Sequence, residues 1–253
     1  MNRPDAKTLL ASGEAAALAA GQMLRVGGQP DLRHVEQAAG HDVKLKADRA
    51  AEALIFDLLS RLTGLGVYSE ESGNLRQAAS GEPCWIVDPL DGSLNYLQGI
   101  PFSAVSLALY QDREPLLGVV YDWQRQELFS GVVGEGAWLN GQPLSPSSVV
   151  DRKQGVLGTG FPVRSDFSSE GLGRFIGEIQ GFRKVRLLGS AALSLAYVAA
   201  GRLEAYREEN IMFWDVAAGW ALARAVGCQS EASWDGGYGS RLPLRVWAPR
   251  MLW

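Results

Sequence analysis

The stretch from Trp85 to Tyr96 restricts the possible folds more than any other part of this sequence. It reads Trp-Ile-Val-Asp-Pro-Leu-Asp-Gly-Ser-Leu-Asn-Tyr, so a short apolar run leads directly into two carboxylates. A run of this length is typical of an interior strand, and we expect Asp88 and Pro89 to end it because proline cannot continue a strand ladder. Asp88 and Asp91 then lie at the carboxyl end of a buried strand.

The residues after Asp91 predict the start of a helix. Gly92 and Ser93 come next, and an Asp-Gly-Ser opening leaves free backbone N–H groups that point at any anion placed there. Carboxylates beside an anion-binding turn indicate a metal ion that bridges protein and phosphate.

Size and charge restrict the class of protein. A chain of 253 residues can bury a sizeable core, either as one large domain or as two small ones. A formal charge of −4 and a pI near 5.3 argue against a surface that coats nucleic acid or an anionic membrane. No apolar run reaches transmembrane length, and the alanine-rich residues 11–20 lack a signal-peptide cleavage pattern. We therefore expect a soluble, cytoplasmic protein without a nucleic-acid or membrane partner.

Cysteine and histidine are too scarce for several kinds of site. The two cysteines, Cys84 and Cys228, cannot form a disulfide framework, and this favours a reducing compartment. The two histidines, His34 and His41, make a zinc site or a histidine-dependent nucleophile triad a weak hypothesis.

Helical and strand periodicities alternate along the chain. The first part predicts a helix over 5–25, a short extended piece at Asp42, a helix from Asp48 to Gly64, a strand over 67–69 that delivers Glu70, and an antiparallel meander over 102–138 closed by a turn at 139–141. The second part predicts strands near 156–159, 185–188 and 203–206, and helices over 169–179, 190–200 and 214–226. This alternation implies an α/β layer arrangement. A Ser- and Pro-rich connector over 143–155 separates the parts, and we expect an N-terminal α+β half (1–145) and a C-terminal α/β half (146–253).

Four acids occupy the ends of strands or the starts of helices, where open α/β structures bind ligands: Glu70, Asp88, Asp91 and Asp215. Oxygen ligands without histidine or thiolate favour Mg²⁺ or Mn²⁺ over zinc. Taken singly, each acid is equally well read as a solvated surface residue or a helix cap, and Asp215 could merely cap its helix. Two acids that flank a proline directly after an apolar strand are hard to explain by packing, and they favour the metal-site interpretation.

Two other patterns give weaker evidence for a binding site. The glycine-rich residues 131–136 sit inside the meander and open no helix, so we interpret them as a turn rather than a phosphate-binding loop. Lys44, Lys46 and Arg49 form a small basic cluster, either a solvated face or a contact with an anionic substrate.

Several motifs in the same order resemble those of one family. They are the residues 42–48, Glu70-Glu71, the 85–96 block, Gly99 and Pro101, the 136–141 stretch, Thr159-Gly-Phe-Pro162, Gly189-Ser-Ala191 and Trp214-Asp215-Val-Ala-Ala-Gly219. On these residues the chain resembles the inositol monophosphatase family, part of a lithium-sensitive, magnesium-dependent phosphatase superfamily that includes fructose-1,6-bisphosphatases. The resemblance implies a layered αβαβα sandwich and a homodimer.

The resemblance also implies a metal site with two or three Mg²⁺ ions, Mn²⁺ being an alternative ion. Glu70, Asp88 and the carbonyl of Leu90 would hold the first ion. Asp88, Asp91 and Asp215 would hold the second, and Glu70 again would hold a weaker third. Most of these ligands fall in the N-terminal half, and the C-terminal half completes the site and the substrate pocket.

The reaction implied is hydrolysis of a phosphomonoester by attack of a metal-activated water on phosphorus. Glu70 and an Asp42–Ser93 pair would orient the water, and the N–H groups of Gly92 and Ser93 would hold the phosphate. The alcohol part of the substrate would lie against Gly189, Ser190, Ala191 and Glu208, with Asp91 and Asp215 also facing the substrate.

Inositol monophosphate is the first substrate that we expect, within the class of small polyol and sugar phosphates. The alternatives are histidinol phosphate, fructose-1,6-bisphosphate and a nucleotide 3′-phosphate. A hypothesis of a different class is a non-catalytic regulatory or interaction protein built on the same fold. The family usually has Thr at the position of Ser93 and Val-Thr at that of Lys44-Leu45, and these differences leave the substrate open.

Overall fold

Helices and strands alternate along the computed structural model, which describes residues 5–26, 32–39, 42–79, 81–161, 166–234 and 237–253. The first part contains α1 (Ala6–Val26), β1 (Val35–Ala39), β2 (Asp42–Leu45), α2 (Lys46–Thr63), β3 (Gly66–Ser69), β4 (Gly73–Arg76), β5 (Cys84–Asp91), α3 (Ser93–Gln98), β6 (Ala104–Gln111), β7 (Glu114–Asp122), β8 (Glu127–Val132), β9 (Gly136–Leu139) and β10 (Gln142–Pro143). The second part contains β11 (Val156–Thr159), α4 (Ser169–Ile179), β12 (Lys184–Leu187), α5 (Ala191–Ala199), β13 (Ala205–Met212), α6 (Phe213–Ala225), β14 (Gln229–Ala232) and β15 (Arg241–Trp247).

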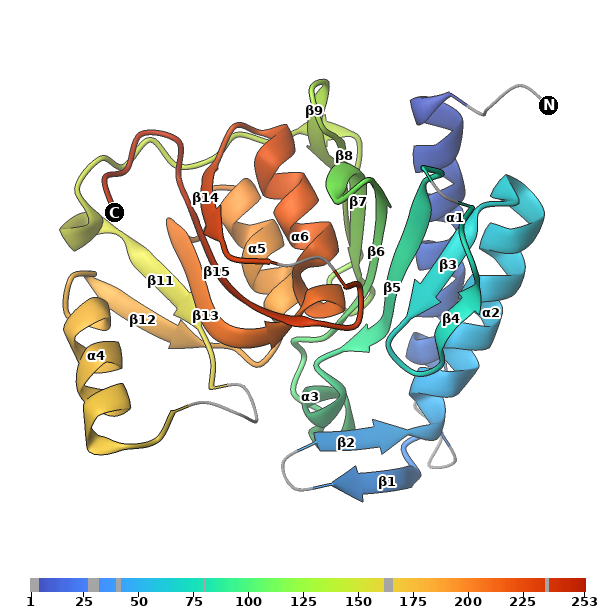
Figure 1. Cartoon of the computed structure of the whole chain (residues 1–253), viewed down its shortest axis with the longest axis horizontal. Helices are drawn as coiled ribbons and strands as arrows, with labels where there is room; N and C mark the ends of the chain where they lie inside the picture. Colours follow the sequence, from blue (N-terminus) through green and yellow to red (C-terminus); the bar gives the residue numbers. More distant parts are fainter. Residues whose placement is uncertain (1–4, 27–31, 40–41, 80, 162–165, 235–236) are drawn as a thin grey trace.

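The layers of the molecule run helix, sheet, helix, sheet, helix (Figure 1). α1 and α2 cover one face of an eight-stranded sheet, whose strand order is β10-β9-β8-β7-β6-β5-β3-β4. α5 and α6 lie between this sheet and a five-stranded sheet of order β12-β11-β13-β15-β14, and α4 lies on the far side of the second sheet. The predicted αβαβα sandwich is therefore confirmed.

The eight-stranded sheet contains the predicted meander. Neighbouring strands from β5 through β10 are antiparallel, and the β9–β10 turn uses Asn140 and Gly141, both with positive φ. β3 is parallel to β5, so the carboxyl ends of these two strands lie at one edge of the sheet. Within the glycine-rich residues 131–136, the predicted turn is formed by 133–135, which join β8 to β9, and the flanking residues belong to these two strands.

Two apolar clusters hold the layers together. The cluster between the sheets joins side chains such as Ile86 and Leu222, and the cluster under α1 and α2 joins Trp85 and Ile55. β5 supplies both clusters, and all eight of its residues are buried, which confirms an interior strand. The inner cluster takes residues from both parts of the chain, and the division at residue 145 stays a prediction.

The end predicted for β5 is wrong. The strand does not stop at Pro89 but continues to Asp91, with Asp88 paired to Ser106 and Asp91 paired to Ala104. Two residues, Pro89 and Leu90, therefore lie opposite a single residue of β6, which is a β-bulge. A bulge accommodates proline because the extra residue is not part of the ladder, and it also redirects the following side chain.

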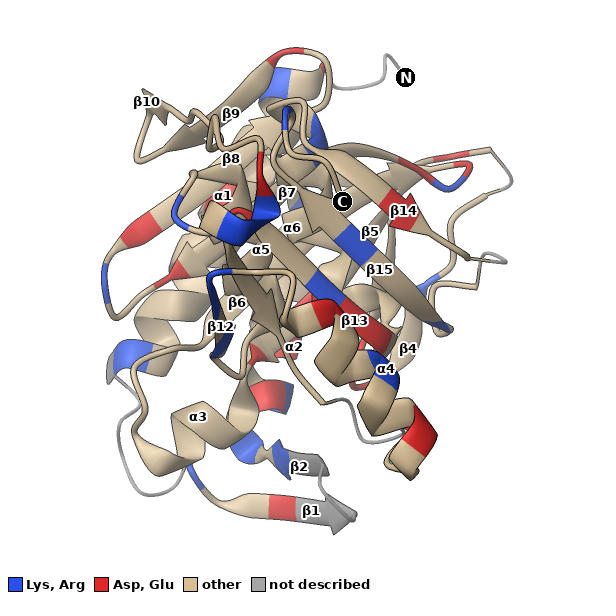
Figure 2. Ribbon diagram, turned by 90° about the vertical axis from the view of Figure 1, so that its left-hand side faces the viewer, with Lys and Arg blue, Asp and Glu red and all other residues tan. Residues whose placement is uncertain are grey.

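The second sheet differs most from the prediction. β13 was expected over 203–206 but runs from Ala205 to Met212, and β14 and β15 were not predicted at all. The sequence of β15, RLPLRVW, alternates polar and apolar residues as a strand should, whereas the four residues of β14, QSEA, carry no such pattern. Figure 2 shows acidic and basic residues side by side on these strands and on α4, where Arg245 pairs with Glu178 and Glu231. Arg207 on β13 also pairs with Glu178, so this face combines ion pairs with a small apolar cluster around Leu157 and Ala205.

Two further sequence expectations concern the cysteines and membrane crossing. Cys84 and Cys228 are both buried, free thiols. No helix in the described ranges combines the length and the apolar character that a membrane crossing requires.

Gly118 tests how closely α6 must approach the eight-stranded sheet. A Cβ atom at Gly118 on β7 would lie 2.4 Å from the carbonyl oxygen of Ala218 on α6. We expect Gly118→Ala to lower the free energy of unfolding by about 1–3 kcal/mol, because the helix backbone must shift. Urea denaturation measures this change.

Gly173→Ala in α4 is the matched control, because a Cβ atom there meets no other atom within 4 Å. It should leave the free energy of unfolding unchanged or raise it by up to about 1 kcal/mol, since alanine favours a helix interior over glycine. Equal destabilisation by both variants would contradict the packing argument.

Candidate active site

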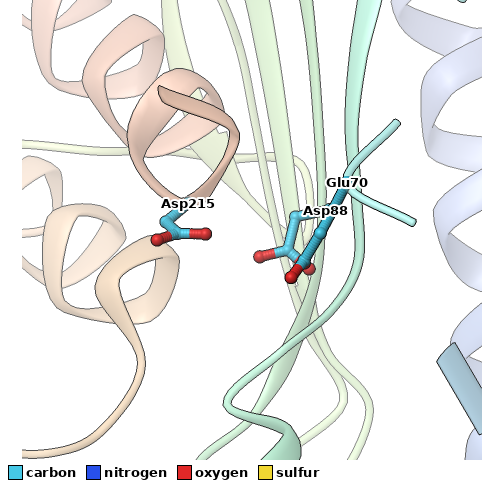
Figure 3. A group of neighbouring side chains, drawn as sticks. All are labelled: Glu70, Asp88 and Asp215. Carbon is cyan, nitrogen blue, oxygen red and sulfur yellow. The ribbon is translucent and has the colours of Figure 1, made fainter. Parts of the chain in front are cut away.

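Three carboxylates from separate elements meet at the edge where β3 and β5 end (Figure 3). Glu70 directly follows β3, Asp88 lies in β5, and Asp215 lies in the first turn of α6. One carboxylate oxygen from each residue lies within 4.8 Å of the other two. The structure thus gathers three of the residues that the sequence suggested as metal ligands, while their role as ligands stays a prediction.

Backbone pairing explains why these acids meet. The N–H of Glu70 donates to the carbonyl of Val87 at 3.0 Å, which continues the parallel pairing of β3 with β5 and places Glu70 beside Asp88. Asp215 stands at the N-terminus of α6, where the helix dipole favours a negative charge.

Burial and mutual repulsion make this group unfavourable without a cation. Asp88 is only 1% exposed. Burial raises its pKa well above the ordinary value, and the charges of Glu70, Asp91 and Asp215 raise that pKa further. Burial, together with the charges of Glu70 and Asp91, likewise raises the pKa of Asp215.

A hard divalent cation fits this group of residues. A cation among the carboxylates would favour their charged forms and so oppose both effects on the pKa. The group offers oxygen donors only, which are the ligands that Mg²⁺ and Mn²⁺ prefer.

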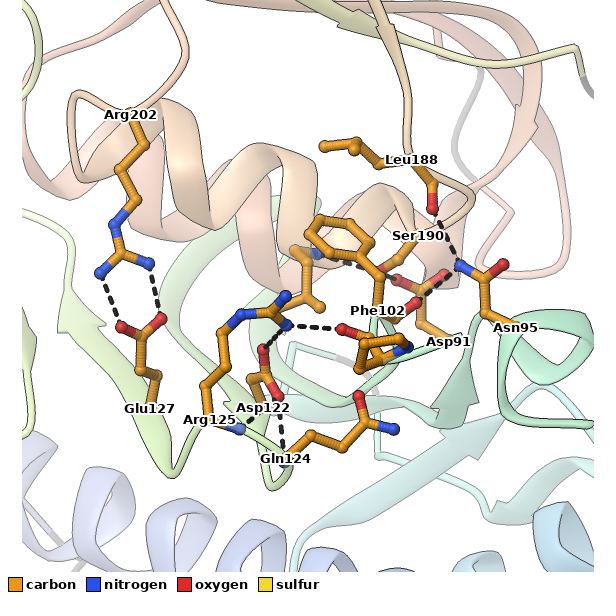
Figure 4. Close-up of polar contacts among 12 residues, drawn as sticks. Asp91, Asn95, Phe102, Asp122, Gln124, Arg125, Glu127, Leu188, Ser190 and Arg202 are labelled. Atoms are coloured by element: carbon orange, nitrogen blue, oxygen red, sulfur yellow. Dashed lines mark hydrogen bonds and ion pairs between the residues drawn. The ribbon is translucent and has the colours of Figure 1, made fainter. Parts of the chain in front are cut away.

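Asp91 links the two parts of the chain. Its Oδ2 accepts a short hydrogen bond from the hydroxyl of Ser190 and a second one from the N–H of Ala192 at 2.9 Å, so it helps to cap α5 (Figure 4). Burial raises its pKa to about 6, although these hydrogen bonds oppose the shift. Asp91 lies outside the group within 4.8 Å, and its role as a metal ligand stays a prediction.

Asn95 is a second link that the sequence analysis did not single out. Its amide donates to the carbonyls of Phe102 at 2.7 Å and Leu188 at 2.8 Å (Figure 4). Gly189 follows with φ 78°, a conformation that favours glycine. A Cβ atom at Gly92 would lie 3.0 Å from the carbonyl oxygen of Gly189, so the predicted phosphate turn and the predicted pocket turn lie against each other.

Ser93 has a carboxylate partner that the sequence analysis did not name. The Ser93 hydroxyl lies 2.7 Å from Oδ1 of Asp48 and 2.9 Å from the carbonyl oxygen of Leu90, and it can donate its single proton to either. Asp48 is therefore the carboxylate that the structure places at Ser93, and the pairing with Asp42 stays a prediction. The side chain of Asp42 lies outside the described residues.

Asp48 reaches Ser93 because it also caps its own helix. The N–H of Leu45 donates to Oδ2 of Asp48 at 2.8 Å, and this bond fixes the carboxylate at the start of α2. Asp48 is 2% exposed, and burial raises its pKa to about 6 while the hydrogen bond from Ser93 lowers it. The sequence signal for Asp48 is its place in the first turn of a helix, where an acid can cap the helix start.

Glu208 lies on β13 and is buried, and burial raises its pKa to about 7. A Cβ atom at Gly160 would lie 2.4 Å from Oε1 of Glu208, so the glycine provides the space that this carboxylate occupies. The buried hydroxyl of Tyr206 on the same strand meets no partner at full hydrogen-bond geometry among the described residues, although its interaction with Glu208 lowers the pKa of that carboxyl and opposes the effect of burial. A ligand with hydroxyl groups would find acceptors and donors on this strand.

The basic cluster is at least partly engaged in ion pairs. The ammonium of Lys44 lies 3.1 Å from Oε2 of Glu71, and the guanidinium of Arg49 lies 2.9 Å from Oε2 of Glu36. These contacts favour the solvated-face interpretation for Arg49, whose side chain is 66% exposed. Pro162, which was part of the resemblance, lies outside the described residues.

Comparison with known proteins decides the family. Residues 5–241 match the model of the inositol monophosphatase family. The chain belongs to the inositol monophosphatase family. It is similar to the Nus factor SuhB of Escherichia coli strain K12, with 37% identity over 203 residues that cover 78% of this chain and 74% of the relative. It is also similar to the inositol-1-monophosphatase of Mesorhizobium japonicum, with 39% identity over 219 residues that cover 84% and 80% of the two chains.

Solved structures of the inositol monophosphatase family agree with the fold described above. The inositol monophosphatase from Anabaena (Nostoc) sp. PCC 7120 superposes with a TM-score of 0.81 at 32% identity, covering 95% of this chain and 90% of the other. Mycobacterium tuberculosis SuhB superposes with a TM-score of 0.82 at 30% identity, covering 99% and 94%. The resemblance read from the sequence is confirmed, and the family is one of phosphatases.

The raised pKa values predict how pH affects the metal-free protein. Asp48 and Asp91 change from 3.8 to about 6 on folding, so the folded state binds more protons than the unfolded state between these values. Their contribution to the free energy of unfolding must therefore fall as pH rises from about 4 to about 6, and Asp88 and Asp215 extend this fall to higher pH. Protons and a cation compete for the same carboxylates, so added Mg²⁺ should stabilise the protein more at higher pH.

Thermal denaturation at two pH values, one near 5 and one above 7, with EDTA or with Mg²⁺, checks this prediction. The rise in Tm on addition of Mg²⁺ should be larger at the higher pH. NaCl at matched ionic strength is the control for screening. An equal rise with NaCl, or a larger Mg²⁺ effect at the lower pH, would contradict the interpretation.

Proposed function

We propose that this protein is a Mg²⁺-dependent phosphomonoesterase that acts on a small polyol or sugar phosphate, with inositol monophosphate as the first candidate. The observation that carries the proposal is the group of Glu70, Asp88 and Asp215, whose carboxylate oxygens converge within 4.8 Å around the buried Asp88. The relative from Mesorhizobium japonicum, named inositol-1-monophosphatase, supports the same substrate.

Five groups would hold the cations: Glu70, Asp88, Asp91, Asp215 and the carbonyl of Leu90. Bound Mg²⁺ supplies a Lewis acid that makes a water more acidic and neutralises charge on the phosphate and the leaving oxygen. The contribution of the chain itself is to gather oxygen ligands from the end of β3, from β5 and from α6 at one place, where they would hold the cations.

Other residues of the chain would orient the reactants. We place the attacking water against Glu70 and the hydroxyl of Ser93, which lies between Asp48 and the Leu90 carbonyl. The N–H groups of Gly92 and Ser93 would hold the phosphate. As the water oxygen bonds to phosphorus, the bond to the alcohol oxygen breaks, and that oxygen takes up a proton.

Glu208 and the turn from Gly189 to Ala191 would hold the alcohol. A buried carboxylate accepts hydrogen bonds from neighbouring hydroxyl groups of a polyol, which favours inositol monophosphate. The same carboxylate would suit the amine of histidinol phosphate, so that substrate stays the main alternative, ahead of fructose-1,6-bisphosphate and nucleotide 3′-phosphates.

Asp88→Asn and Asp215→Asn test the catalytic role. We expect each to lower turnover by more than about 100-fold, because even partners of metal ligands cost about 10–100-fold when removed. Rates on a panel of the four phosphates, with Mg²⁺ and with EDTA, measure this and rank the substrates. Asp57→Asn, a change at an exposed carboxylate on α2, is the matched control.

The panel also separates the proposal from the non-catalytic alternative. Several relatives carry the name Nus factor SuhB, which describes no phosphatase, and this keeps the alternative open for the present chain. Folded wild-type protein that hydrolyses none of the four phosphates in Mg²⁺ would overturn the proposal, as would wild-type activity of either Asn variant.

We also propose a homodimer, in which a second copy covers the outer edge of the five-stranded sheet. β12 is the edge strand there, and Leu187 on it is 60% exposed. Phe167, just before α4, is 58% exposed, and Ile176 on α4 is 46% exposed. Sedimentation velocity should give the mass of two chains for the wild type and of one chain for Leu187→Glu, since a buried charge opposes association. The mass of two chains for both proteins would contradict this interface, and the mass of one chain for the wild type would contradict the homodimer.

A further inference from the structure

The turn that carries Glu70 is held at each of its three residues. Glu70 donates its N–H to Val87 on β5, as described above. The side chain of Glu71 pairs with Lys44 on β2 at 3.1 Å and is only 3% exposed. Ser72 donates its N–H to Oε1 of Glu52 at 3.1 Å and its hydroxyl to Oε2 at 2.6 Å.

Glu52 accepts hydrogen bonds from the turn with both of its carboxylate oxygens. It lies on α2, twenty residues before Ser72, and it is 7% exposed. A buried carboxylate is unfavourable unless hydrogen bonds satisfy it, and bonds to an ionised acceptor are among the stronger ones. The two bonds from one residue fix both the position and the orientation of the backbone at Ser72.

Asp48 and Glu52 are four residues apart on α2, so their side chains leave the same face of the helix. Asp48 contacts Ser93 at the start of α3, and Glu52 contacts Ser72 after β3. One buried helix face thus holds two of the segments that build the candidate active site. Neither Glu52 nor Ser72 carries a role in the proposed reaction.

We propose that Glu52 is a positioning residue for the metal site. By holding Ser72, it sets the direction in which the turn presents the carboxylate of Glu70 to Asp88 and Asp215. The pairing with Lys44 engages Glu71, so Glu70 is the acid of this turn that joins the group within 4.8 Å. This inference rests on the proposed metal site, but not on the identity of the substrate or on turnover.

Loss of Glu52 would release Ser72 and widen the range of positions open to Glu70. The expected consequence is weaker cation binding, because a metal site needs its oxygens held within a few tenths of an ångström. Removing a residue that orients a ligand typically lowers metal affinity by about 10–100-fold.

Isothermal titration of Mn²⁺ and Mg²⁺ into four variants tests the proposal without using activity. Glu52→Ala should weaken binding by about 10–100-fold, and Ser72→Ala, which removes the hydroxyl only, should weaken it less. Glu52→Gln should restore most of the affinity, because its amide can accept from the Ser72 N–H and donate to the Ser72 oxygen. Asp57→Ala, which removes an exposed carboxylate from the same helix, should bind like the wild type.

The Mg²⁺ concentration that gives half-maximal rate provides a second measurement on the active protein. It should rise in Glu52→Ala while the rate at saturating Mg²⁺ changes less, since a positioning residue touches no reactant. Circular dichroism checks that each variant is folded. If Glu52→Ala does not fold, the comparison of Ser72→Ala with the wild type decides.

Wild-type cation affinity in folded Glu52→Ala, or in Ser72→Ala where the first variant does not fold, would overturn the inference. So would a Glu52→Gln variant as weak as Glu52→Ala. A wild-type protein that binds Mg²⁺ but hydrolyses no phosphate would sink the proposed function and leave this inference intact. A wild-type protein that binds neither cation would overturn both.

Discussion

The repulsion among buried carboxylates is the constraint on which the rest of the structure depends. Glu70, Asp88 and Asp215 converge around the buried Asp88, and the charge of Glu70 helps to raise the pKa of both aspartates. Such a group is retained only if a ligand compensates it, and the surrounding chain must keep it in place when no ligand is bound. The surrounding backbone pairing and hydrogen bonds hold these carboxylates together against this repulsion.

Backbone pairing and buried hydrogen bonds between distant segments keep the acids in place. The parallel pairing of β3 with β5 sets Glu70 next to Asp88, and the close packing of Gly118 against α6 sets the depth of Asp215. On one side of the site, α2 holds two turns through its buried acids. On the other side, Asp91 and Asn95 hold the turn before α5, so residues from both sheets are fixed against one another.

Sequence reasoning succeeded where the chemistry is local and failed where it depends on pairing. The apolar run at Trp85, the helix start at Asp215 and the meander were predictable, because periodicity and capping act over a few residues. The continuation of β5 through Pro89 was missed, since only the partner strand shows that the proline sits in a bulge. β13 was predicted too short because Arg207 and its neighbours are charged, and their ion-pair partners come from elements far away in the sequence.

The sequence by itself determined the set of acids considered for the metal site, because residue types and their places at strand ends and helix starts are local features. The family and the αβαβα order of layers followed from the resemblance of its motifs to those of known proteins. Only the tertiary structure decided which acids actually meet and which residues hold them. Ser93 contacts Asp48 at the start of α2, and Ser72 contacts Glu52 one turn further along the same helix. The physical reason is that a hydrogen bond requires two groups within about 3 Å of each other, and that proximity is set by packing rather than by distance along the chain.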